Sequence, residues 1–531
     1  MREIELLVAL LVVITALAEV ANRVSLPYPV LLVLTGIGLG LVPGLPRVVL
    51  APDLVFFVIL PPLLYSAAWQ ASWPDFKAAR RPIVGLGLGL MVFSTGLVAA
   101  VAHYCLPGFG WATAFVLGAV VSPTDTVAAV AATKNLPVPK RVATVLEGES
   151  MVNDAAGLIA YRYAVAAVAT GQFAAWQAGG QLLWVAGAGV GIGLALGVLF
   201  YGLHRLSNSN AVVDISLTFL TPYAAYLLAE EAHASGVLAV VTTGLFLSRR
   251  SARIFTHDSR LQTTVVWNTV VFLLNGAVFV LIGLELPVLM EGIGKGSFGR
   301  LAGYGALVSL TVIGGRLLWV YAGAYLPRRL SRRVGARGPR PDAAPTAVVA
   351  WTGMRGVLSL AAALALPLAL PSGAAFPQRS LILLLTFAVI FVTLVLQGLS
   401  LAPLIRWLGL RPDGKEEEEE QTLRVLLATH IAAYLDSPAA AAQAPAEVLD
   451  RMKTRYVLRL QRLRERPSGD QAGGPDEKPL TPFQQLQEVL IRFERGVIEQ
   501  LRREEKISEE ALRKVENELD LEESRMALDR A

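Results

Sequence analysis

Long apolar stretches recur through the first 410 residues of this 531-residue chain, and they restrict the folds that it can adopt. Many are close to or longer than the roughly 20 residues that cross a bilayer as a helix. The chain is 54% hydrophobic and 17% charged, which is less charge than a soluble protein of this length carries. The sequence therefore predicts an all-α integral membrane protein. We expect about 13 transmembrane helices, at residues 4–21, 28–43, 52–70, 83–106, 111–132, 142–169, 177–203, 212–231, 235–248, 263–290, 301–326, 344–370 and 380–408.

The distribution of charge supports this count and predicts an orientation. Residues 411–531 hold 20 Lys and Arg against 26 Asp and Glu, a net charge of −6, so residues 1–410 carry +11. If the C-terminus is cytoplasmic, thirteen alternating spans place 18 Lys and Arg on the inner side and 5 on the outer side. Such an excess is typical of cytoplasmic membrane loops, not of nucleic-acid binding. We therefore expect the N-terminus outside and the C-terminus in the cytoplasm.

After "RPDGKEEEEE" the chain changes from apolar to charged, which predicts two domains, a transmembrane domain at 1–410 and a helical cytoplasmic tail at 411–531. Three helical patterns follow in the tail, at 421–436, 448–466 and 483–528. The plainest interpretation is a solvated, partly helical appendage. A role in regulation or in a dimer contact is the more specific alternative.

The fifth span carries a proline and an acid within an apolar run, "VLGAVVSPTDTVAAV". Pro123 has no amide hydrogen, so it interrupts the helix and frees a carbonyl upstream. Broken helices occur at membrane depth where they line a cavity or are buried in protein. The oxygens beside the break could then bind a monovalent cation, and they belong to Ser122, Thr124, Asp125 and Thr126. The alternative is a simple proline kink.

The sixth span, "LEGESMVNDAAGLIAY", contains polar residues that share one helix face at i, i+3 and i, i+4 spacing: Ser150, Asn153, Asp154 and Gly157. Asp154 lies about 19 Å along a helix that starts near residue 142, which is close to the membrane midplane. A charge at this depth is costly unless it is paired or faces water, so Asp154 is a candidate site for a cation or proton.

Two arginines lie in apolar surroundings further along the chain. Arg316 is in "VIGGRLLWVY", and Arg355 is between two glycines in "WTGMRGVLSL", which indicates a second helix break. Each arginine stays charged and needs an acid or several carbonyls. We expect Glu149 to pair with Arg316 in a structural salt bridge. We expect Arg355 to bind the free carbonyls where the two broken helices cross.

The breaks in the fifth and twelfth spans occupy corresponding positions in two halves of the domain. That arrangement is typical of inverted-repeat transporters, whose binding site lies at the midplane between discontinuous helices.

Four segments together resemble the signature segments of the monovalent cation:proton antiporter-1 family, which includes bacterial NhaP-type and animal sodium/proton exchangers. They are "FFVILPPLLYSAAW", "SPTDTVAAV", "EGESMVNDAAGLIAY" and "WTGMRGVLSLAAALALP", and the resemblance covers about residues 1–410 in order and spacing. It implies a homodimer whose protomers have a dimerisation subdomain and a core subdomain with two crossed, unwound helices.

The resemblance also implies roles for individual residues. Asp154 would be the carboxylate that binds the cation and the proton, and Asn153 would support it. Asp125 and the Thr124 carbonyl would lie at the first crossing, with Ser150 nearby as a further cation ligand.

Four other positions enter the comparison with the family. Glu149 with Arg316 would be the family's structural ion pair, and Arg355 would be the arginine of the second crossing. Many relatives carry an acid two positions after "LPPLL", where this chain has Ser66, so its cation site would be weaker or of different preference.

The function that the resemblance implies is exchange of Na⁺, or of K⁺ or Li⁺, for H⁺ across the plasma membrane. No cofactor and no enzymatic activity are expected, and Asn153 before Asp154 implies an electroneutral exchange. A K⁺-preferring antiporter and a cation channel are the alternatives. Less favoured are an intramembrane aspartyl protease, which would use Asp125 and Asp154, and a sensor that signals through the tail.

Overall fold

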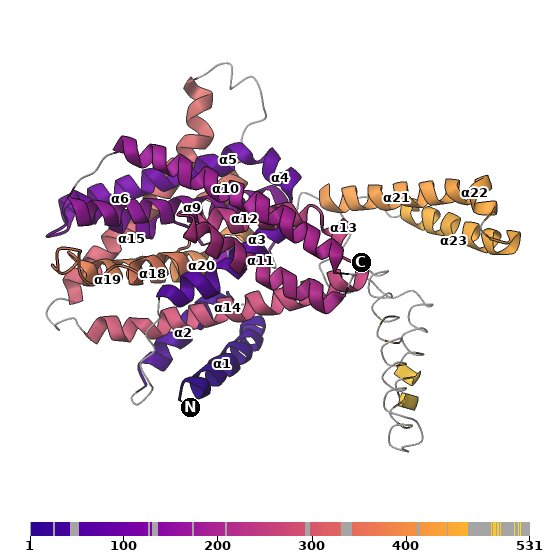
Figure 1. Cartoon of the computed structure of the whole chain (residues 1–531), viewed down its shortest axis with the longest axis horizontal. Coiled ribbons are helices and arrows are strands. Elements are labelled where there is room, and N and C mark those ends of the chain that lie inside the picture. The colour runs from indigo at the N-terminus through magenta and orange to yellow at the C-terminus, as the bar shows by residue number, and fades with distance from the viewer. Residues whose placement is uncertain are drawn as a thin grey trace. The chain divides into compact units, whose positions relative to one another are not determined.

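The computed structural model describes residues 2–24, 27–42, 52–125, 128–129, 136–171, 175–207, 210–291, 298–330, 342–410, 415–442 and 444–465, with single positions between 490 and 521. Within these residues the chain is helical, and the only β feature is an isolated bridge between Ala369 and Ala375 (Figure 1). The chain divides into two compact units, Met1–Asp413 and Gly414–Ala531.

The first half of unit 1 contains helices in each of the stretches that the sequence predicts as spans. They are α1 (Arg2–Val24), α2 (Tyr28–Gly40), the π-helix η1 (Leu54–Ile59), α3 (Leu60–Gln70), α4 (Trp73–Ala78), α5 (Arg80–Val84), the π-helix η2 (Gly85–Leu90), α6 (Met91–Cys105), α7 (Trp111–Val121) and α9 (Lys140–Thr170).

The second half of unit 1 continues in the same way. Its elements are α10 (Ala175–Leu206), α11 (Ala211–Glu231), α12 (Gly236–Ser248), α13 (Ser251–Ile254), α14 (His257–Glu291), α15 (Phe298–Leu330), α17 (Ala343–Trp351), α18 (Val357–Leu364), α19 (Arg379–Val392), the π-helix η3 (Thr393–Gln397) and α20 (Gly398–Trp407).

Among the described residues, six helical stretches are long and apolar enough to cross a membrane. They are Arg80–Cys105, Leu183–Leu206, Ala211–Glu231, Ser259–Glu285, Gly299–Leu326 and Arg379–Trp407. Shorter apolar helices accompany them, including Trp111–Val121 and Gly236–Ser248. The sequence prediction of a helical membrane protein is therefore confirmed.

One π-helix has a local chemical cause. Pro62 has no amide hydrogen and so cannot donate to the carbonyl of Val58, one helical turn earlier. The Tyr223 hydroxyl of α11 donates to that carbonyl instead, at 3.1 Å. The widened turn η1 ends one residue before the two prolines, and α11 packs against it.

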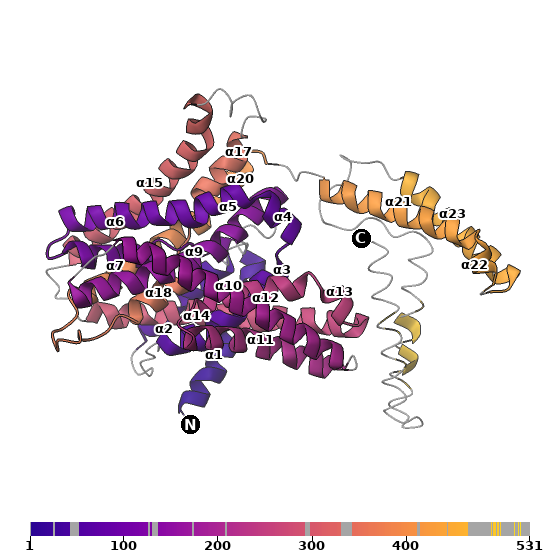
Figure 2. The ribbon, with the colours of Figure 1, turned by 45° about the horizontal axis from the view of Figure 1, so that its top comes forward.

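Helix contacts in unit 1 form two sets that matter for the site. One set contains α10, α11 and α12, which pack on one another, with α14 against α11. The other contains α7, α9 and α18, with η2 against α9 (Figure 2). The site described below lies in the second set.

Unit 2 begins with two longer helices, α21 (Lys415–Leu435) and α23 (Ala446–Glu465), joined through the short α22 (Pro438–Ala441). They pack on each other, with Gln421 donating to the Leu463 carbonyl at 3.1 Å and Lys453 paired with Asp436 at 2.7 Å. The first helix starts earlier than its predicted position because the Lys and Glu residues before 421 are good helix formers. The predicted helix at 483–528 lies mostly outside the described residues.

Candidate functional site

Two helix breaks, far apart in the sequence, lie against each other. Helix α7 ends at Val121 and residues 122–125 are not helical, while α17 ends at Trp351 and α18 starts only at Val357. The amide of Asp125 donates to the carbonyl of Met354 at 2.8 Å. The first break follows from Pro123, and the two breaks are joined directly through their main chains.

A glycine allows this close approach. A Cβ atom on Gly356 would overlap the carboxylate of Asp125, so any other residue there would displace that side chain. The carboxylate of Asp125 therefore lies beside the main chain of the second break, and it is only partly buried.

Arg355 is 1% exposed and binds main-chain carbonyls at both breaks. Its Nε donates to the carbonyl of Val121 at 3.1 Å, and its Nη1 donates to the carbonyl of Gly353. Carbonyls at a helix C-terminus have no partner within the helix, and a buried cation is well suited to supply one.

Sequence reasoning missed Thr393 of η3. Its hydroxyl accepts a hydrogen bond from the amide of Arg355 at 3.1 Å and thereby anchors the second break to the last membrane helix of unit 1. The only signal in the sequence is a pair of threonines seven residues apart, Thr386 and Thr393, in an otherwise apolar run.

Helix α9 packs against the first break through Gly157 and through the hydroxyl of Ser150. A Cβ atom on Gly157 would collide with the ring of Pro123, so glycine permits the contact. The Ser150 hydroxyl lies 3.2 Å from the carbonyl of Thr124 and 3.5 Å from Oδ2 of Asp154, which is at the outer limit for a hydrogen bond. Ser150, Thr124 and partly buried Asp154 are thus brought together.

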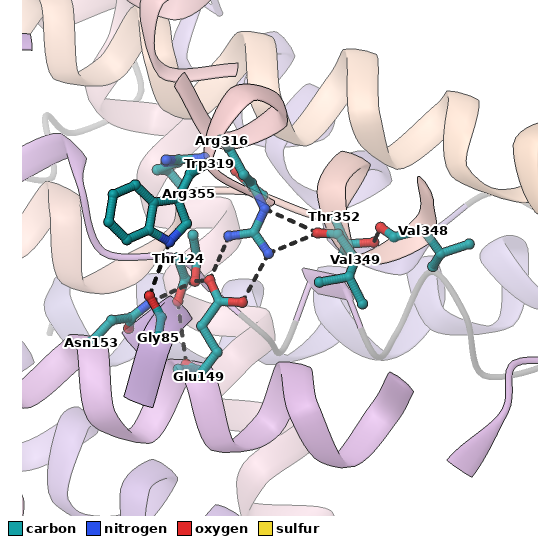
Figure 3. Close-up of polar contacts among 12 residues, drawn as sticks. Gly85, Thr124, Glu149, Asn153, Arg316, Trp319, Val348, Val349, Thr352 and Arg355 are labelled. Carbon is teal, nitrogen blue, oxygen red and sulfur yellow. Dashed lines mark hydrogen bonds and ion pairs between the residues drawn. The ribbon is translucent and has the colours of Figure 1, made fainter. Parts of the chain in front are cut away.

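Glu149 and Arg316, which are 167 residues apart, form a buried ion pair (Figure 3). Arg316 donates through Nη1 and Nη2 to the two carboxylate oxygens, the second at 2.9 Å. It also donates to the carbonyl of Val349 from Nε at 3.2 Å and from Nη2 at 3.0 Å. Both side chains are about 1% exposed, so the added hydrogen bonds are needed to offset the cost of burying two charges.

The Thr124 hydroxyl connects this ion pair to Asn153. It donates to Oε1 of Glu149 at 3.0 Å and accepts from Nδ2 of Asn153 at 2.6 Å (Figure 3). An ionised carboxylate only accepts hydrogen bonds, so the single proton of the hydroxyl goes to Glu149 and the partner at Asn153 must be a donor. An amide at position 153 meets this requirement, whereas an ionised carboxylate there would not.

The hydrogen bond of Asn153 goes to Thr124 and not to Asp154. Among the described residues no hydrogen bond joins Asn153 to Asp154, and the amide oxygen of Asn153 is buried with no protein partner. Asn153 is therefore tied to the ion pair, while Asp154 faces Ser150.

The arrangement collects oxygen atoms of the kind that hard cations prefer. Two partly buried carboxylates, Asp125 and Asp154, lie with the Ser150 hydroxyl and the Thr124 carbonyl near the helix breaks. The two buried arginines already have partners: Arg316 pairs with Glu149, and Arg355 donates to main-chain carbonyls. These oxygen atoms could bind a monovalent cation or a proton reversibly.

The model of the transmembrane sodium/hydrogen exchanger family matches residues 7–407. The chain belongs to the sodium/hydrogen exchanger family. This confirms the resemblance of the four segments, and it makes the chain a multi-pass membrane protein of a family of cation/proton antiporters, which are transporters and not enzymes.

Relatives of this chain include a sodium, potassium, lithium and rubidium/H⁺ antiporter from Bacillus pumilus. It is 34% identical over 76% of this chain, and the match spans 61% of that protein's length. The uncharacterized Na⁺/H⁺ exchanger YjcE from Escherichia coli is 29% identical over 98% of both chains, so its similarity extends through the tail.

Solved structures show the same fold. The sodium proton antiporter MjNhaP1 from Methanocaldococcus jannaschii superposes with a TM-score of 0.60 at 20% sequence identity. The match covers 77% of this chain and 99% of that chain. The two proteins therefore share a helical fold.

Proposed function

We propose that this exchanger carries Na⁺ one way and H⁺ the other across the plasma membrane, using Asp154 as the shared binding group. The observation that carries the proposal is the position of Asp154 beside Ser150 and the first helix break, where the Thr124 carbonyl accepts from the same hydroxyl. Family membership and the names of the relatives support the substrates.

The cation and the proton compete for one carboxylate. Asp154 holds either H⁺ or a dehydrated cation, with Asp125, the Thr124 carbonyl and Ser150 as further cation ligands. An empty, charged carboxylate is costly to carry through a low-dielectric barrier, so only the loaded site crosses. Loading by either ion neutralises Asp154, which couples the two fluxes without ATP.

The rest of the site is scaffold in this proposal. The pair of Glu149 and Arg316 holds α9 to α15, and Arg355 holds the two breaks together. Asn153 is a neutral amide that donates to Thr124 and carries no charge, so one cation exchanges for one proton and the cycle is electroneutral.

The proposed architecture has thirteen membrane crossings, inverted repeats and two crossed broken helices. The N-terminus is outside, the tail is cytoplasmic, and two chains form a homodimer in the lipid bilayer. Residues 1–410 form the antiporter domain, with dimerisation and core subdomains, and residues 411–531 form the charged tail.

Potassium is a second candidate substrate, because the Bacillus relative is named for sodium, potassium, lithium and rubidium. Position 66 is consistent with a broad preference. Ser66 is 4% exposed, and its hydroxyl accepts from Gln70 at 3.1 Å, so this position carries no carboxylate that would hold a small cation tightly.

The test uses purified protein in proteoliposomes with an imposed pH gradient. Na⁺, K⁺ and Li⁺ are added in separate experiments, and the proton flux is recorded after each addition, with choline as the control cation. Cation-dependent proton flux that is lost in Asp154→Ala supports the proposal. Undiminished exchange in Asp154→Ala excludes the carboxylate, and steady conductance without proton coupling in planar bilayers would indicate a channel.

A further inference from the structure

A second ion pair in unit 1 takes no part in the proposed binding site. Arg162 of α9 donates from Nη2 to Oε2 of Glu230 of α11 at 2.6 Å. Arg162 follows Asp154 by eight residues on the same helix, which places it about 12 Å further along the helix axis. The pair therefore links the helix that carries the proposed exchange site to a helix that contributes nothing to that site.

Glu230 is anchored on its own side. Its second carboxylate oxygen, Oε1, accepts from the amide of Gly236 at 3.3 Å, at the start of α12. The ring of Tyr226 fills the space beside Gly236, where a Cβ atom would collide with it. Glu230 is thus held within the set formed by α10, α11 and α12.

Arg162 belongs to the other set of helices. Helix α9 packs against α7, η2 and α18, the elements around the two breaks, and it also touches α12, whereas α11 packs on α10, α12 and α14. The contact between Arg162 and Glu230 consequently crosses from one set to the other. Any movement of α9 relative to α11 changes the distance between the guanidinium and the carboxylate.

We infer that Arg162 and Glu230 form a conformational latch that stabilises the arrangement seen here. The inference rests on the proposed function, since alternating access requires the helix bearing Asp154 to move relative to the rest of unit 1. In the proposed topology the end of α11 at Glu231 faces outside. The latch therefore holds the outer end closed and favours the arrangement that is open to the cytoplasm.

The size of the effect on transport follows from the solvent exposure of the Arg162 and Glu230 side chains. The two side chains are 46% and 19% exposed, so the pair contributes modestly and its loss shifts populations without blocking transport. We expect a shift of about 2- to 5-fold in the ratio of the two arrangements. Because apparent affinity scales with the fraction of the competent arrangement, the KM for Na⁺ should rise on the inner face and fall on the outer face.

The first experiment measures these two KM values in inside-out and right-side-out vesicles containing the full chain. Arg162→Gln and Glu230→Gln should each move them in opposite directions by about 2- to 5-fold. The swapped double variant Arg162→Glu/Glu230→Arg should return toward wild type, and Glu231→Gln, an exposed neighbouring acid, serves as the matched control. Unchanged KM values, or values that move the same way on both faces, would overturn the latch.

The second experiment fixes the latch covalently. Arg162→Cys and Glu230→Cys are combined with Cys105→Ser, which removes the exposed native thiol, and joined by a bifunctional thiol reagent with a reducible linker. Exchange should stop after cross-linking and return on reduction. Exchange that continues in the cross-linked protein overturns the latch but leaves the proposed function standing. Absence of exchange in the Cys105→Ser parent and in wild type instead overturns the proposed function.

Discussion

Replacing Glu149 by Gln should destabilise the membrane unit strongly, and the structure sets the size of the effect. Glu149 accepts two hydrogen bonds from Arg316, and both side chains are about 1% exposed. Glutamine keeps the volume and can still accept from Thr124, but it removes the negative charge and one of the two acceptors. Arg316 then keeps the Val349 carbonyl and one neutral amide oxygen as partners, and its buried charge has lost its countercharge.

Breaking a buried ion pair by removing one partner costs about 3–5 kcal/mol. The same range follows from losing hydrogen bonds to a charged group, at about 1.5–3 kcal/mol each. For a unit of 413 residues, an unfolding entropy of about 2.1 cal/mol/K per residue gives about 1.2 °C per kcal/mol, which predicts a fall in Tm of roughly 4–6 °C.

The assay is thermal unfolding of the purified full-length protein in one detergent, followed by tryptophan fluorescence at a fixed scan rate. Glu231→Gln, the same substitution at an exposed position of unit 1, should leave Tm within about 1 °C of wild type. The double variant Glu149→Gln/Arg316→Met removes both charges and should recover most of the loss. A fall in Glu149→Gln no larger than that of the Glu231 control would refute the reasoning.

Three further predictions concern transport. Asp154→Asn should abolish cation-coupled proton flux while leaving the folded fraction on size-exclusion chromatography unchanged, since an amide cannot exchange a proton; retained coupling would contradict the carboxylate mechanism. Gly157→Val should lower the exchange rate at least about tenfold, because the valine side chain would displace Pro123 and the ligands that follow it. The exchange rate of the milder Gly157→Ala should fall between those of Gly157→Val and wild type. Equal rates in all three proteins would count against the close contact. The KM for Na⁺ should rise as the pH falls on the same face while the maximal rate at saturating Na⁺ stays constant, because H⁺ and the cation compete for one group; a fall in maximal rate with constant KM would show that they bind at separate sites.

The sequence was sufficient to predict the helices and the residue types of the site. Helical spans require only a run of apolar residues, and proline at 123 interrupts the helical hydrogen bonds wherever the helix lies. The pairing of Glu149 with Arg316 was also predictable, because a buried arginine needs an acid and few acids occur in the apolar part of the chain.

Several contacts could not be predicted in this way. Thr393 binds the amide of Arg355, the Val121 carbonyl accepts from its side chain, and the Thr124 hydroxyl joins Glu149 to Asn153. Threonine in a membrane helix usually bonds to its own main chain, so its partners depend on which helices lie beside it. The direction of the Asn153 hydrogen bond likewise depends on Glu149. The Thr124 hydroxyl donates to Glu149, so it can only accept from Asn153.

What the sequence by itself determined is a helical membrane protein with two interrupted spans and a few charges too costly to leave unpaired. Periodicity, proline and burial cost are local properties, and they act whatever the neighbouring helices are. Only the tertiary structure decided that the two breaks share a hydrogen bond, that Asp154 faces Ser150 while Asn153 faces Thr124, and that Arg162 reaches Glu230. These contacts join residues on different elements, or select one face of a helix, so they depend on how the helices pack.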